Sequence, residues 1–484
     1  MAIDKSERGL SFMKRILSLA LAVLMLLGIA ACGGEKEPEG FQIPKVEAFS
    51  VGFGKTEITP EYGTPMGGFG NSATKLSNSV LDPLYTVVMA MSDGTDTYLL
   101  VALDVPGAYT DFVDPTVELI STETGLPKEN ILMCSVHNHS APDMGSIYKE
   151  NEQAAKVHEQ FRQGTLEAAK TALLDLSPAT MLGGKTKTEQ LAFVRHFLLN
   201  DNTYAGDNFG NWSSGIKDYA LPVDDEVVAV KFQREGKKDL VLVNFNIHPC
   251  FTAGNEKYEI SADCVGATRD YLASKGMDCI YFTGAAGNQN GETKILEDVT
   301  NFTHVQWGEK LGEYVLNLEY TDITGQDIKM TSEVYTGQVW KETDLDRVAK
   351  AKEVYQLFQQ TDRDTATPLA KQYGLASVYE AREIINHAES LPDTWDIPMT
   401  TLSVGGWGIV VAPYEMFGTQ GTYIKDNSAF PVTTILGYAA PHVGYIPDVR
   451  AYEYGCYESQ TAKFVSGTAE ILADKYLDLL QSIK

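Results

Sequence analysis

Two histidines, His137 and His139, stand two residues apart directly after the apolar run 131–133. A strand-like run that ends in His-x-His can direct two imidazoles toward one point beyond the end of the strand. Imidazole nitrogen is a good zinc ligand, and a catalytic zinc ion needs three protein ligands and one open position for water. The pair alone could equally be two histidines that hydrogen-bond within a loop. It therefore indicates a zinc site only if the rest of the chain supplies further ligands.

Three further side chains stand beside apolar runs and could complete such a site. His248 ends the run 240–247, and Glu415 follows the run 408–413, where a carboxylate costs free energy unless a charged group meets it. Tyr445 lies in a turn-rich segment close behind. Each has an ordinary alternative, namely a structural histidine, a solvated glutamate and a packed tyrosine. Their common placement favours a metal-dependent hydrolase, and the structural alternative stays open.

Alternating strands and helices are expected to position these side chains. The hydrophobic patterns predict strands at 49–54, 87–91, 97–103, 227–232, 240–247 and 279–282, and helices at 150–174, 264–275 and 302–318. Beyond them we expect helix over 345–389 with a break near Pro368, one long strand or a strand pair over 400–411, and a closing helix over 459–482. This alternation predicts an α/β fold with a mixed sheet and flanking helices, with the chemistry in loops beyond the strand ends.

Residues 1–32 have the order of a bacterial lipoprotein signal. Two basic residues precede an apolar run over 16–31, and Cys32 follows its small last residues. The run is short for a transmembrane anchor. We therefore expect Cys32 to be lipidated, residues 33–45 to form a tether, and the body at 46–484 to be a single extracytoplasmic domain anchored to a bacterial membrane.

The overall charge excludes one class of partner. The formal net charge is −26 at neutral pH, which argues against nucleic acid as a partner because such proteins present basic surfaces. The charge fits a soluble body held off an anionic membrane. About 450 residues remain after the signal, enough for one large domain or two ordinary ones, and no stretch resembles a linker between domains.

The cysteines do not form a disulfide framework in the sequence. Five of the six lie beyond Cys32, and their spacing is scattered. Cys134 and Cys250 each lie within three residues of a candidate histidine. A thiolate ligand is therefore an alternative to the commoner state of a small, buried, free cysteine.

At this point the chain resembles the neutral ceramidases and their bacterial relatives, a family of zinc-dependent amide hydrolases. The resemblance covers nearly the whole mature chain in the same order, and the ordered set of motifs is more specific than any one of them. It is carried by GFGKTEITP at 52–60, HNHSAP at 137–142, NIHP at 246–249 with SAD at 261–263, PYE at 413–415, and GYIP at 444–447 with YE at 457–458.

The resemblance implies a role for each of these residues. It implies that the zinc ligands are His137, His248, Glu415 and Tyr445. It also implies that three further side chains contact the substrate or the developing oxyanion, namely His139, Arg195 and Tyr457. Arg195 could instead be a solvated surface residue. Asp263 could accept a hydrogen bond from a ligand histidine or equally could cap the following helix.

These residue types suit hydrolysis by a water molecule. Zinc lowers the pKa of bound water toward neutrality and polarises the amide carbonyl. His139 can serve as general base or acid, because the unperturbed pKa of histidine lies near neutrality. Arg195 and Tyr457 can donate hydrogen bonds to a tetrahedral oxyanion.

The chain departs from the family in two places. Ceramidases carry a Gly-Asp-x-Ser-Pro-Asn turn, whereas this chain has GNQNGE at 287–292, so Asn290 stands at the serine position. Asn288 and Asn290 can bind substrate through their amides, but neither can be a nucleophile. The family also continues into an immunoglobulin-like domain, which we do not expect here. Both departures argue against ceramide itself as the substrate.

We therefore predict a zinc-dependent hydrolase of an amide, an N-acyl bond, with Zn2+ as cofactor and a small-molecule or lipid-like N-acyl substrate. A zinc-dependent esterase or lactonase is the nearest alternative, since the same chemistry serves both bonds. A non-catalytic ligand-binding lipoprotein is the alternative from a different class. The presence of four candidate ligands argues against it, because a binding protein does not need them.

Overall fold

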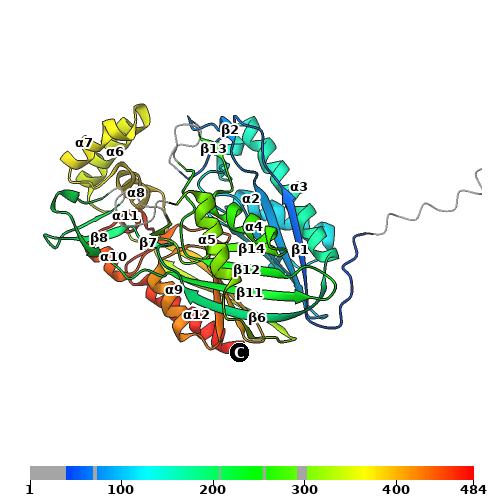
Figure 1. Cartoon of the computed structure of the whole chain (residues 1–484). Coiled ribbons are helices and arrows are strands. Elements are labelled where there is room, and N and C mark those ends of the chain that lie inside the picture. The colour runs from blue at the N-terminus through cyan, green and yellow to red at the C-terminus, as the bar shows by residue number, and fades with distance from the viewer. Residues whose placement is uncertain (1–39, 69–73, 207–208, 254–257, 292–301) are drawn as a thin grey trace, which may run out of the picture. The chain divides into compact units, whose positions relative to one another are not determined.

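A nine-stranded mixed sheet forms the centre of the computed structural model, which describes residues 40–68, 74–206, 209–253, 258–291 and 302–484 (Figure 1). Cys32 lies outside these residues, and those from Ile43 to Lys484 form one compact unit. The strands run in the order β14 (Asp278–Thr283), β12 (Leu240–Phe245), β11 (Glu226–Arg234), β6 (Ser177–Lys187), β1 (Ser50–Glu57), β3 (Tyr85–Ser92), β4 (Thr97–Leu103) and β5 (Ile131–Ser135), with β16 (Thr321–Asp322) on β6. The pairs β4–β5 and β12–β14 are parallel, and the other neighbours are antiparallel.

Helices cover one face of this sheet. They are α3 (Glu152–Leu174), α4 (Asp263–Ser274) and α5 (His304–Leu316). The approach of α3 to β1 is close: a Cβ at Gly52 would lie 2.0 Å from the carbonyl oxygen of Ala172, and one at Gly54 would lie 2.0 Å from that of Ala168. On the same face, the rings of Phe245 and Trp307 lie 5.6 Å apart. The two glycines of the 52–60 motif thus let helix backbone pack directly on strand backbone.

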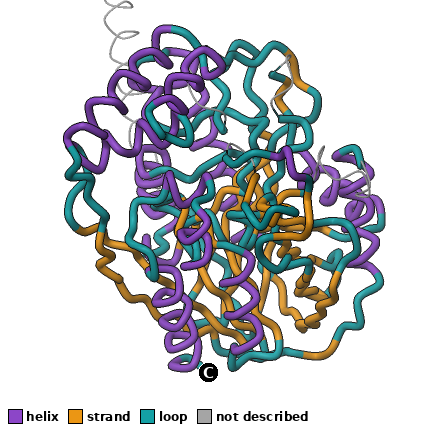
Figure 2. Tube along the Cα trace, turned by 90° about the vertical axis from the view of Figure 1, so that its left-hand side faces the viewer, coloured by secondary structure: helices purple, strands orange, loops and turns teal. Residues whose placement is uncertain are grey.

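A second, four-stranded sheet packs on the other face. Its order is β17 (Ile328–Gln338), β18 (Thr394–Val404), β19 (Trp407–Val411) and β21 (Val432–Leu436), with β19 and β21 parallel. The rings of Phe232 and Trp407 lie 5.7 Å apart where the sheets meet, inside a large buried core. The outer face of this sheet is covered by α9 (Gly418–Asn427) and α12 (Thr468–Ser482). The result is four layers, and Figure 2 shows the strands in the middle with helices outside them.

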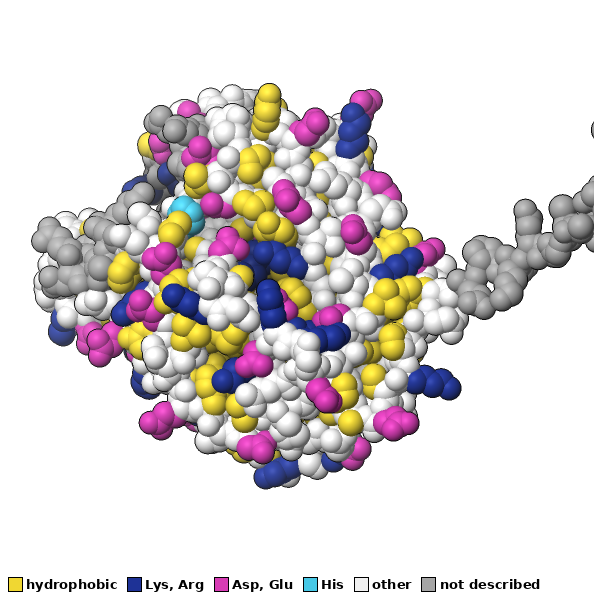
Figure 3. All heavy atoms as spheres, turned by 45° about the vertical axis from the view of Figure 1, so that its right-hand side comes forward, with side chains coloured by type: hydrophobic (Ala, Val, Ile, Leu, Met, Phe, Trp, Pro, Cys, Tyr) yellow, Lys and Arg dark blue, Asp and Glu magenta, His cyan; other side chains and the backbone are white. Residues whose placement is uncertain are grey.

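Smaller elements lie around these layers. Near the site are α2 (Thr110–Thr124), β7 (Phe193–Val194), β8 (His196–Leu199), β15 (Gln289–Asn290), β20 (Glu415–Met416), β22 (Tyr445–Ile446), α10 (Val449–Tyr454) and α11 (Tyr457–Thr461). A further group, α6 (Leu345–Gln360), α7 (Arg363–Gln372) and α8 (Val378–Glu389), has its own small hydrophobic core. On the face in Figure 3, Lys and Arg side chains gather around a central hollow, with Asp and Glu at its margins. The negative net charge is therefore unevenly distributed over the surface.

The predicted fold class, a mixed α/β architecture with flanking helices, is confirmed, and the part of the chain described contains no immunoglobulin-like unit. Residues 400–411 belong to an antiparallel strand pair. None of the helices among the described residues is long and apolar enough to cross a bilayer.

The region 345–389 is helical and interrupted, as predicted, but the interruptions do not lie at Pro368. Pro368 lies inside α7, and helical structure stops before Arg363 and after Gln372. Before α7, the side chain of Asp362 caps the helix by accepting a hydrogen bond from the backbone of Thr365. After α7, Gly374 has a φ of 76°. Local capping therefore decides where these helices end.

The predicted closing helix over 459–482 is also interrupted. The structure has α11 and α12 with an extended segment between them, in which Phe464 pairs with Val339. Gly467, with a φ of 92°, then begins α12.

Candidate active site

The candidate zinc ligands lie where strands of both sheets end. His137 follows β5, His248 follows β12, and Glu415 and Tyr445 begin the short strands β20 and β22 that follow β19 and β21. In β20 and β22, Glu415 is paired directly with Tyr445. The carboxyl ends of parallel strands are the usual place for a site in such sheets. Here two sheets contribute their strand ends to one place.

Backbone hydrogen bonds hold these strand ends together. The amide of Ser135, the last residue of β5, donates to the carbonyl of Tyr438 at 3.1 Å, and the amide of Gly437 donates to the carbonyl of Thr283 at 3.0 Å. Each bond joins the end of β21 in the smaller sheet to a strand end of the larger one. The position of the site is therefore fixed by backbone rather than by flexible side chains.

The two histidines predicted as ligands are oriented from behind by backbone carbonyls. Nδ1 of His137 lies 2.6 Å from the carbonyl oxygen of Pro106, and Nδ1 of His248 lies 2.8 Å from that of Ala286. A carbonyl can only accept, so both Nδ1 atoms carry the proton and both Nε2 lone pairs face the site. This arrangement is typical of histidines that bind a metal. His137 also has a φ of 63°, which is uncommon for a residue other than glycine.

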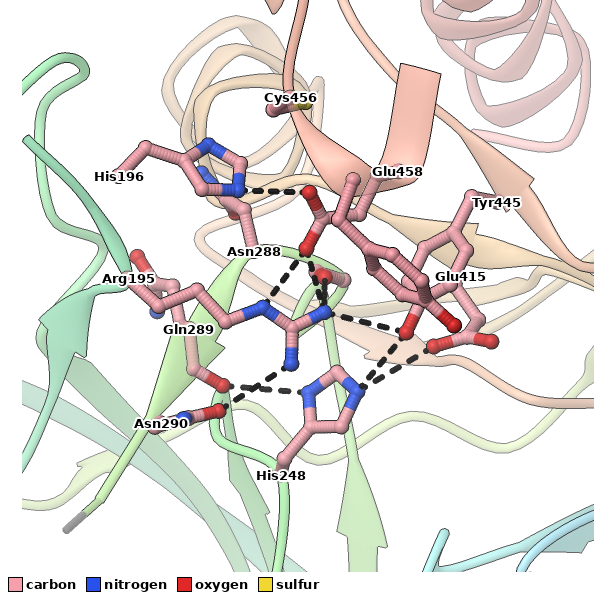
Figure 4. Close-up of polar contacts among 12 residues, drawn as sticks. Arg195, His196, His248, Asn288, Gln289, Asn290, Glu415, Tyr445, Cys456 and Glu458 are labelled. Carbon is pink, nitrogen blue, oxygen red and sulfur yellow. Dashed lines mark hydrogen bonds and ion pairs between the residues drawn. The ribbon is translucent and has the colours of Figure 1, made fainter. Parts of the chain in front are cut away.

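The predicted ligand atoms converge. Oε2 of Glu415 lies 3.4 Å from Nε2 of His137. It also lies 3.3 Å from Nε2 of His248, and the hydroxyl of Tyr445 lies 3.5 Å from the same nitrogen (Figure 4). Nε2 of His139 lies 3.0 Å from that of His137. His139 thus shares the same small space, and the three histidines alone could hold a metal ion.

These distances fit a zinc ion. Ligand atoms at 2.0–2.1 Å from a tetrahedral zinc ion lie about 3.3–3.4 Å from one another. The two contacts of Glu415 have this length. Oε2 of Glu415 is buried and accepts no hydrogen bond from the described residues. A carboxylate oxygen that faces two imidazole lone pairs calls for a positive charge between them.

Burial sets the protonation states at the site. It lowers the pKa of His248 to about 3, and it lowers the pKa values of His137 and His139 well below their usual range. All three imidazoles are therefore neutral at physiological pH and can offer lone pairs. Burial raises the pKa of Glu415 to about 7, so its carboxyl holds a proton below about pH 7 and loses it above that pH or when a cation binds.

Arg195 points into the site and is only 8% exposed, so it is not a solvated surface residue. Nη2 donates to the hydroxyl of Tyr445 at 3.1 Å and to the carbonyl of Gly287 at 2.9 Å, and Nη1 donates to Oδ1 of Asn290 at 3.4 Å (Figure 4). Burial raises the pKa of Tyr445 well above its usual range, and the positive charge of Arg195 partly opposes this. The guanidinium thus connects a predicted ligand with a predicted substrate contact.

The remaining predicted residues occupy different depths. The ring of Tyr457 packs edge-on against that of Tyr445, with centroids 6.0 Å apart. His139 is half-buried and borders a small pocket. Asn288 is fully buried, and its Oδ1 accepts a hydrogen bond from the amide of Gly418 at 3.0 Å. A substrate could reach Asn288 only by displacing its neighbours, whereas Asn290 is half-buried beside Arg195.

Two alternatives raised by the sequence are decided by the geometry. Asp263 contacts neither of the predicted ligand histidines, and it does not cap α4, whose N-cap residue is Ala262. Its Oδ2 accepts hydrogen bonds from the amide and the hydroxyl of Thr252, both at 2.8 Å, which fixes the turn after His248. Cys134 is completely buried, and burial raises the pKa of its thiol, so it is not poised to be a thiolate ligand.

Three residues of the site were not singled out from the sequence. Nε2 of His442 lies 3.7 Å from Oε1 of Glu415, and its ring stacks on that of Tyr438. Glu458 and His196 lie behind Arg195. His442 and Glu458 stand within motifs or segments that were noted for their tyrosines, and His196 directly follows Arg195. Their proximity to those residues was the available signal.

No family model and no curated protein sequence matches the chain. Solved structures do. The neutral ceramidase from Pseudomonas aeruginosa is similar with a TM-score of 0.65 and 12% identity, over 90% of this chain and 74% of that one. A ceramidase complexed with C2 is similar with a TM-score of 0.65 and 13% identity, over 90% of this chain and 75% of that one. At these identities the likeness is one of fold, and the chain has a ceramidase-like fold.

Proposed function

We propose that this chain is a zinc-dependent hydrolase that cleaves an N-acyl amide bond. The observation that carries the proposal is the convergence of His137, His248 and Glu415. Oε2 of Glu415 lies 3.3–3.4 Å from both Nε2 atoms, and backbone carbonyls hold both Nδ1 protons. The ceramidase-like fold supports the same assignment.

The chain's own residues would share the work. His137, His248, Glu415 and Tyr445 would hold the ion. When bound, zinc would lower the pKa of a water molecule toward neutrality and polarise the scissile carbonyl. His139 is neutral and half-buried, so its imidazole can accept a proton from the attacking water and return it to the leaving amine. Its lowered pKa makes it a weaker base than a solvated histidine.

Donors on the other side of the site would stabilise the oxyanion. Arg195 and Tyr457 are the side chains proposed for this role, and the Arg195 guanidinium is already fixed by its bonds to Gly287 and Tyr445. A donor that is held in place before the reaction costs no reorganisation as charge develops. The amide of Asn290, next to Arg195, would bind the substrate.

The substrate is proposed to be a small-molecule or lipid-like N-acyl compound. The chain is proposed to meet it outside the cytoplasm, anchored to a bacterial membrane by a lipid on Cys32. Radiolabelled fatty acid supplied to cells that express the chain, and in parallel a Cys32→Ser variant, tests this part. Label on the wild type alone supports the anchor, and equal label on both contradicts it.

A substrate panel tests the reaction. The purified protein is stripped of metal, reloaded with zinc, and given N-acyl amides, matched esters and lactones, with release of the free carboxylate as the readout. We expect turnover of an amide that depends on zinc. Turnover of esters or lactones alone would favour the esterase reading, and binding without turnover of any of them would favour a ligand-binding protein.

A further inference from the structure

Glu458 is a buried carboxylate next to the site that the proposed reaction does not use. It lies in α11 and is completely buried. Its Oε1 accepts a hydrogen bond of 2.7 Å from Nε of Arg195 and forms an ion pair with Nη2 at 2.5 Å. Its Oε2 lies 2.7 Å from Nε2 of His196 (Figure 4). One carboxylate thus contacts two consecutive residues, Arg195 and His196, at the junction of β7 and β8.

Both partners are themselves held in place. Nδ1 of His196 shares a hydrogen bond of 2.8 Å with the hydroxyl of Tyr454. Burial alone would raise the pKa of Glu458, but the charges of His196 and Arg195 lower it below its usual range. Glu458 is therefore ionised at physiological pH, and its charge is matched by the guanidinium.

A second metal site is the alternative for this cluster. His196, Cys456 and Glu458 offer ligand atoms that lie within 4.8 Å of one another. However, both ring nitrogens of His196 already have hydrogen-bond partners, and the guanidinium of Arg195 contacts the same carboxylate. Burial also raises the pKa of the Cys456 thiol well above its usual range. A metal ion at this place would have to displace the guanidinium of Arg195 and break both hydrogen bonds of His196.

We infer that Glu458 and His196 are positioning residues, which fix the guanidinium of Arg195 against the hydroxyl of Tyr445 and the amide of Asn290. The inference deepens the proposed function and rests on it. The side chain of Arg195 is long and flexible, and without Glu458 its guanidinium would lose the hydrogen bond and the ion pair that set its direction. Arg195 would then no longer hold the hydroxyl of Tyr445. Because Tyr445 is a predicted ligand, the substitution should also affect the metal site.

The first test compares Glu458→Gln with Glu453→Gln. Both remove one carboxylate, and Glu453 is an exposed residue of the neighbouring helix α10. Residues that orient metal ligands typically contribute about 10–100-fold to metal affinity or activity. We expect Glu458→Gln to lower zinc affinity, measured by chelator competition, or kcat by a factor of this size. KM should change less than about threefold, because Arg195 acts near the reacting atoms rather than on the rest of the substrate. Glu453→Gln should match the wild type.

A double-mutant cycle with Arg195→Met separates positioning from a general structural role. If Glu458 acts through Arg195, adding Glu458→Gln to Arg195→Met should change zinc affinity and kcat by less than about threefold. Independent, multiplicative losses from the two substitutions would overturn the inference. So would a Glu458→Gln variant that is indistinguishable from Glu453→Gln, and so would a second equivalent of zinc bound by the wild type and lost in Cys456→Ser.

His196 provides a second route if Glu458→Gln does not fold. Asparagine at 196 keeps a polar atom near the Nδ1 position but cannot reach Glu458, whereas glutamine can place a donor near the Nε2 position. We expect His196→Asn to lose zinc affinity or kcat by about tenfold and His196→Gln to lose less. Equal values for both would overturn the inference. A wild type that binds no zinc would instead contradict the proposed function, so the two failures can be told apart.

Discussion

Oε2 of Glu415 lies 3.3 Å from Nε2 of His248, and both side chains are almost completely buried. The proton of His248 is on Nδ1, where a backbone carbonyl accepts it, so two electron-rich atoms face each other across this distance. Such a pair is stable only when a proton or a metal ion lies between the two atoms. Burial raises the pKa of Glu415 to about 7, which makes it the group that holds the proton in the metal-free protein below that pH.

This relationship predicts how zinc affinity depends on pH. The histidines are already neutral, because burial lowers the pKa of His248 to about 3 and those of His137 and His139 well below normal. Below about pH 7, zinc must therefore displace the proton of Glu415. Above that pH, Glu415 carries no proton for zinc to displace. The slope of the logarithm of zinc affinity against pH gives the number of protons released per ion. This slope should be larger by one between pH 5 and 7 than between pH 7.5 and 8.5.

Chelator competition at these pH values measures the two slopes, and Glu415→Gln is the matched variant. Glutamine keeps an oxygen at the position but has no proton to release, so its slope should be the same on both sides of pH 7. If the wild-type slope between pH 5 and 7 exceeded the slope between pH 7.5 and 8.5 by two or three protons per ion, the histidines would be protonated in the metal-free site.

The same pKa shifts predict opposite effects on folding of the metal-free protein. The pKa of Glu415 is raised in the folded state, so its contribution is present below about pH 4.3 and is lost as the pH rises toward 7. The pKa of His248 is lowered, so its contribution is present above about pH 6.5 and is lost as the pH falls toward 3. Glu415→Gln should therefore remove the fall in the free energy of unfolding that Glu415 causes as the pH rises from 5 to 7. Urea titrations across this range check it, and an unchanged profile would contradict the raised pKa.

Substitution of the ligands should divide the site into two groups. We expect His137→Ala and Glu415→Ala to lose zinc and activity together, since each removes a converging ligand atom. His139→Ala should lose activity and keep zinc, because the Glu415 carboxylate contacts His137 and His248 instead. Zinc content measured after dialysis distinguishes them. If His139→Ala lost zinc while His137→Ala kept it, the roles of the two histidines would be reversed.

The packing of α3 on β1 predicts a cost for filling the space at Gly54. A methyl group there would overlap the backbone carbonyl of Ala168, and backbone cannot move aside as a side chain can. Gly54→Ala should therefore lower the free energy of unfolding by at least about 1–3 kcal/mol. Gly236→Asn is a suitable comparison, because nothing lies within 4 Å of that turn and asparagine tolerates its positive φ. Chemical denaturation of both variants tests this, and equal stabilities would show that α3 can shift.

A buried ion pair predicts a second large effect on stability. Arg269 and Asp104 are bonded through both guanidinium Nη atoms, at 2.8 and 2.5 Å, and are nearly inaccessible to solvent. Asp104→Ala leaves a buried, unmatched charge and should cost about 3–5 kcal/mol. Lys350→Ala removes one partner of an exposed pair and should cost about 0–1 kcal/mol. Thermal unfolding tests this prediction, and equal melting temperatures for the two variants would contradict it.

The candidate ligands could be named from the sequence because His137, His248 and Glu415 each follow an apolar run that becomes a strand, as His248 does after β12. Tyr445 lies in a turn-rich segment instead, and zinc binding by these four residues stays a prediction. It did not reveal that a second sheet supplies Glu415 and Tyr445, since the pairing of strand ends depends on tertiary contacts such as that between Ser135 and Tyr438. The carbonyls of Pro106 and Ala286 that orient the histidines carry no side-chain signal at all.

The burial and the contacts of several side chains could not be predicted from the sequence either. Asn288 and Asn290 are two residues apart, yet one is fully buried and the other faces Arg195. The association of His196 with Glu458 joins segments far apart in the chain, and nothing in either segment indicates the other. Pro368 shows the limit of a strong local signal, because the capping residue Asp362 rather than the proline separates the helices.

Zinc titration of the metal-free protein tests the central claim most directly. The protein is stripped with a chelator, zinc is added back in steps, and bound metal and carboxylate release from an N-acyl amide are measured on the same samples. We predict that one zinc ion binds per chain, that activity rises in proportion, and that His248→Ala shows neither. Zinc that binds equally well to His248→Ala, or a wild type that takes up none, would contradict the account.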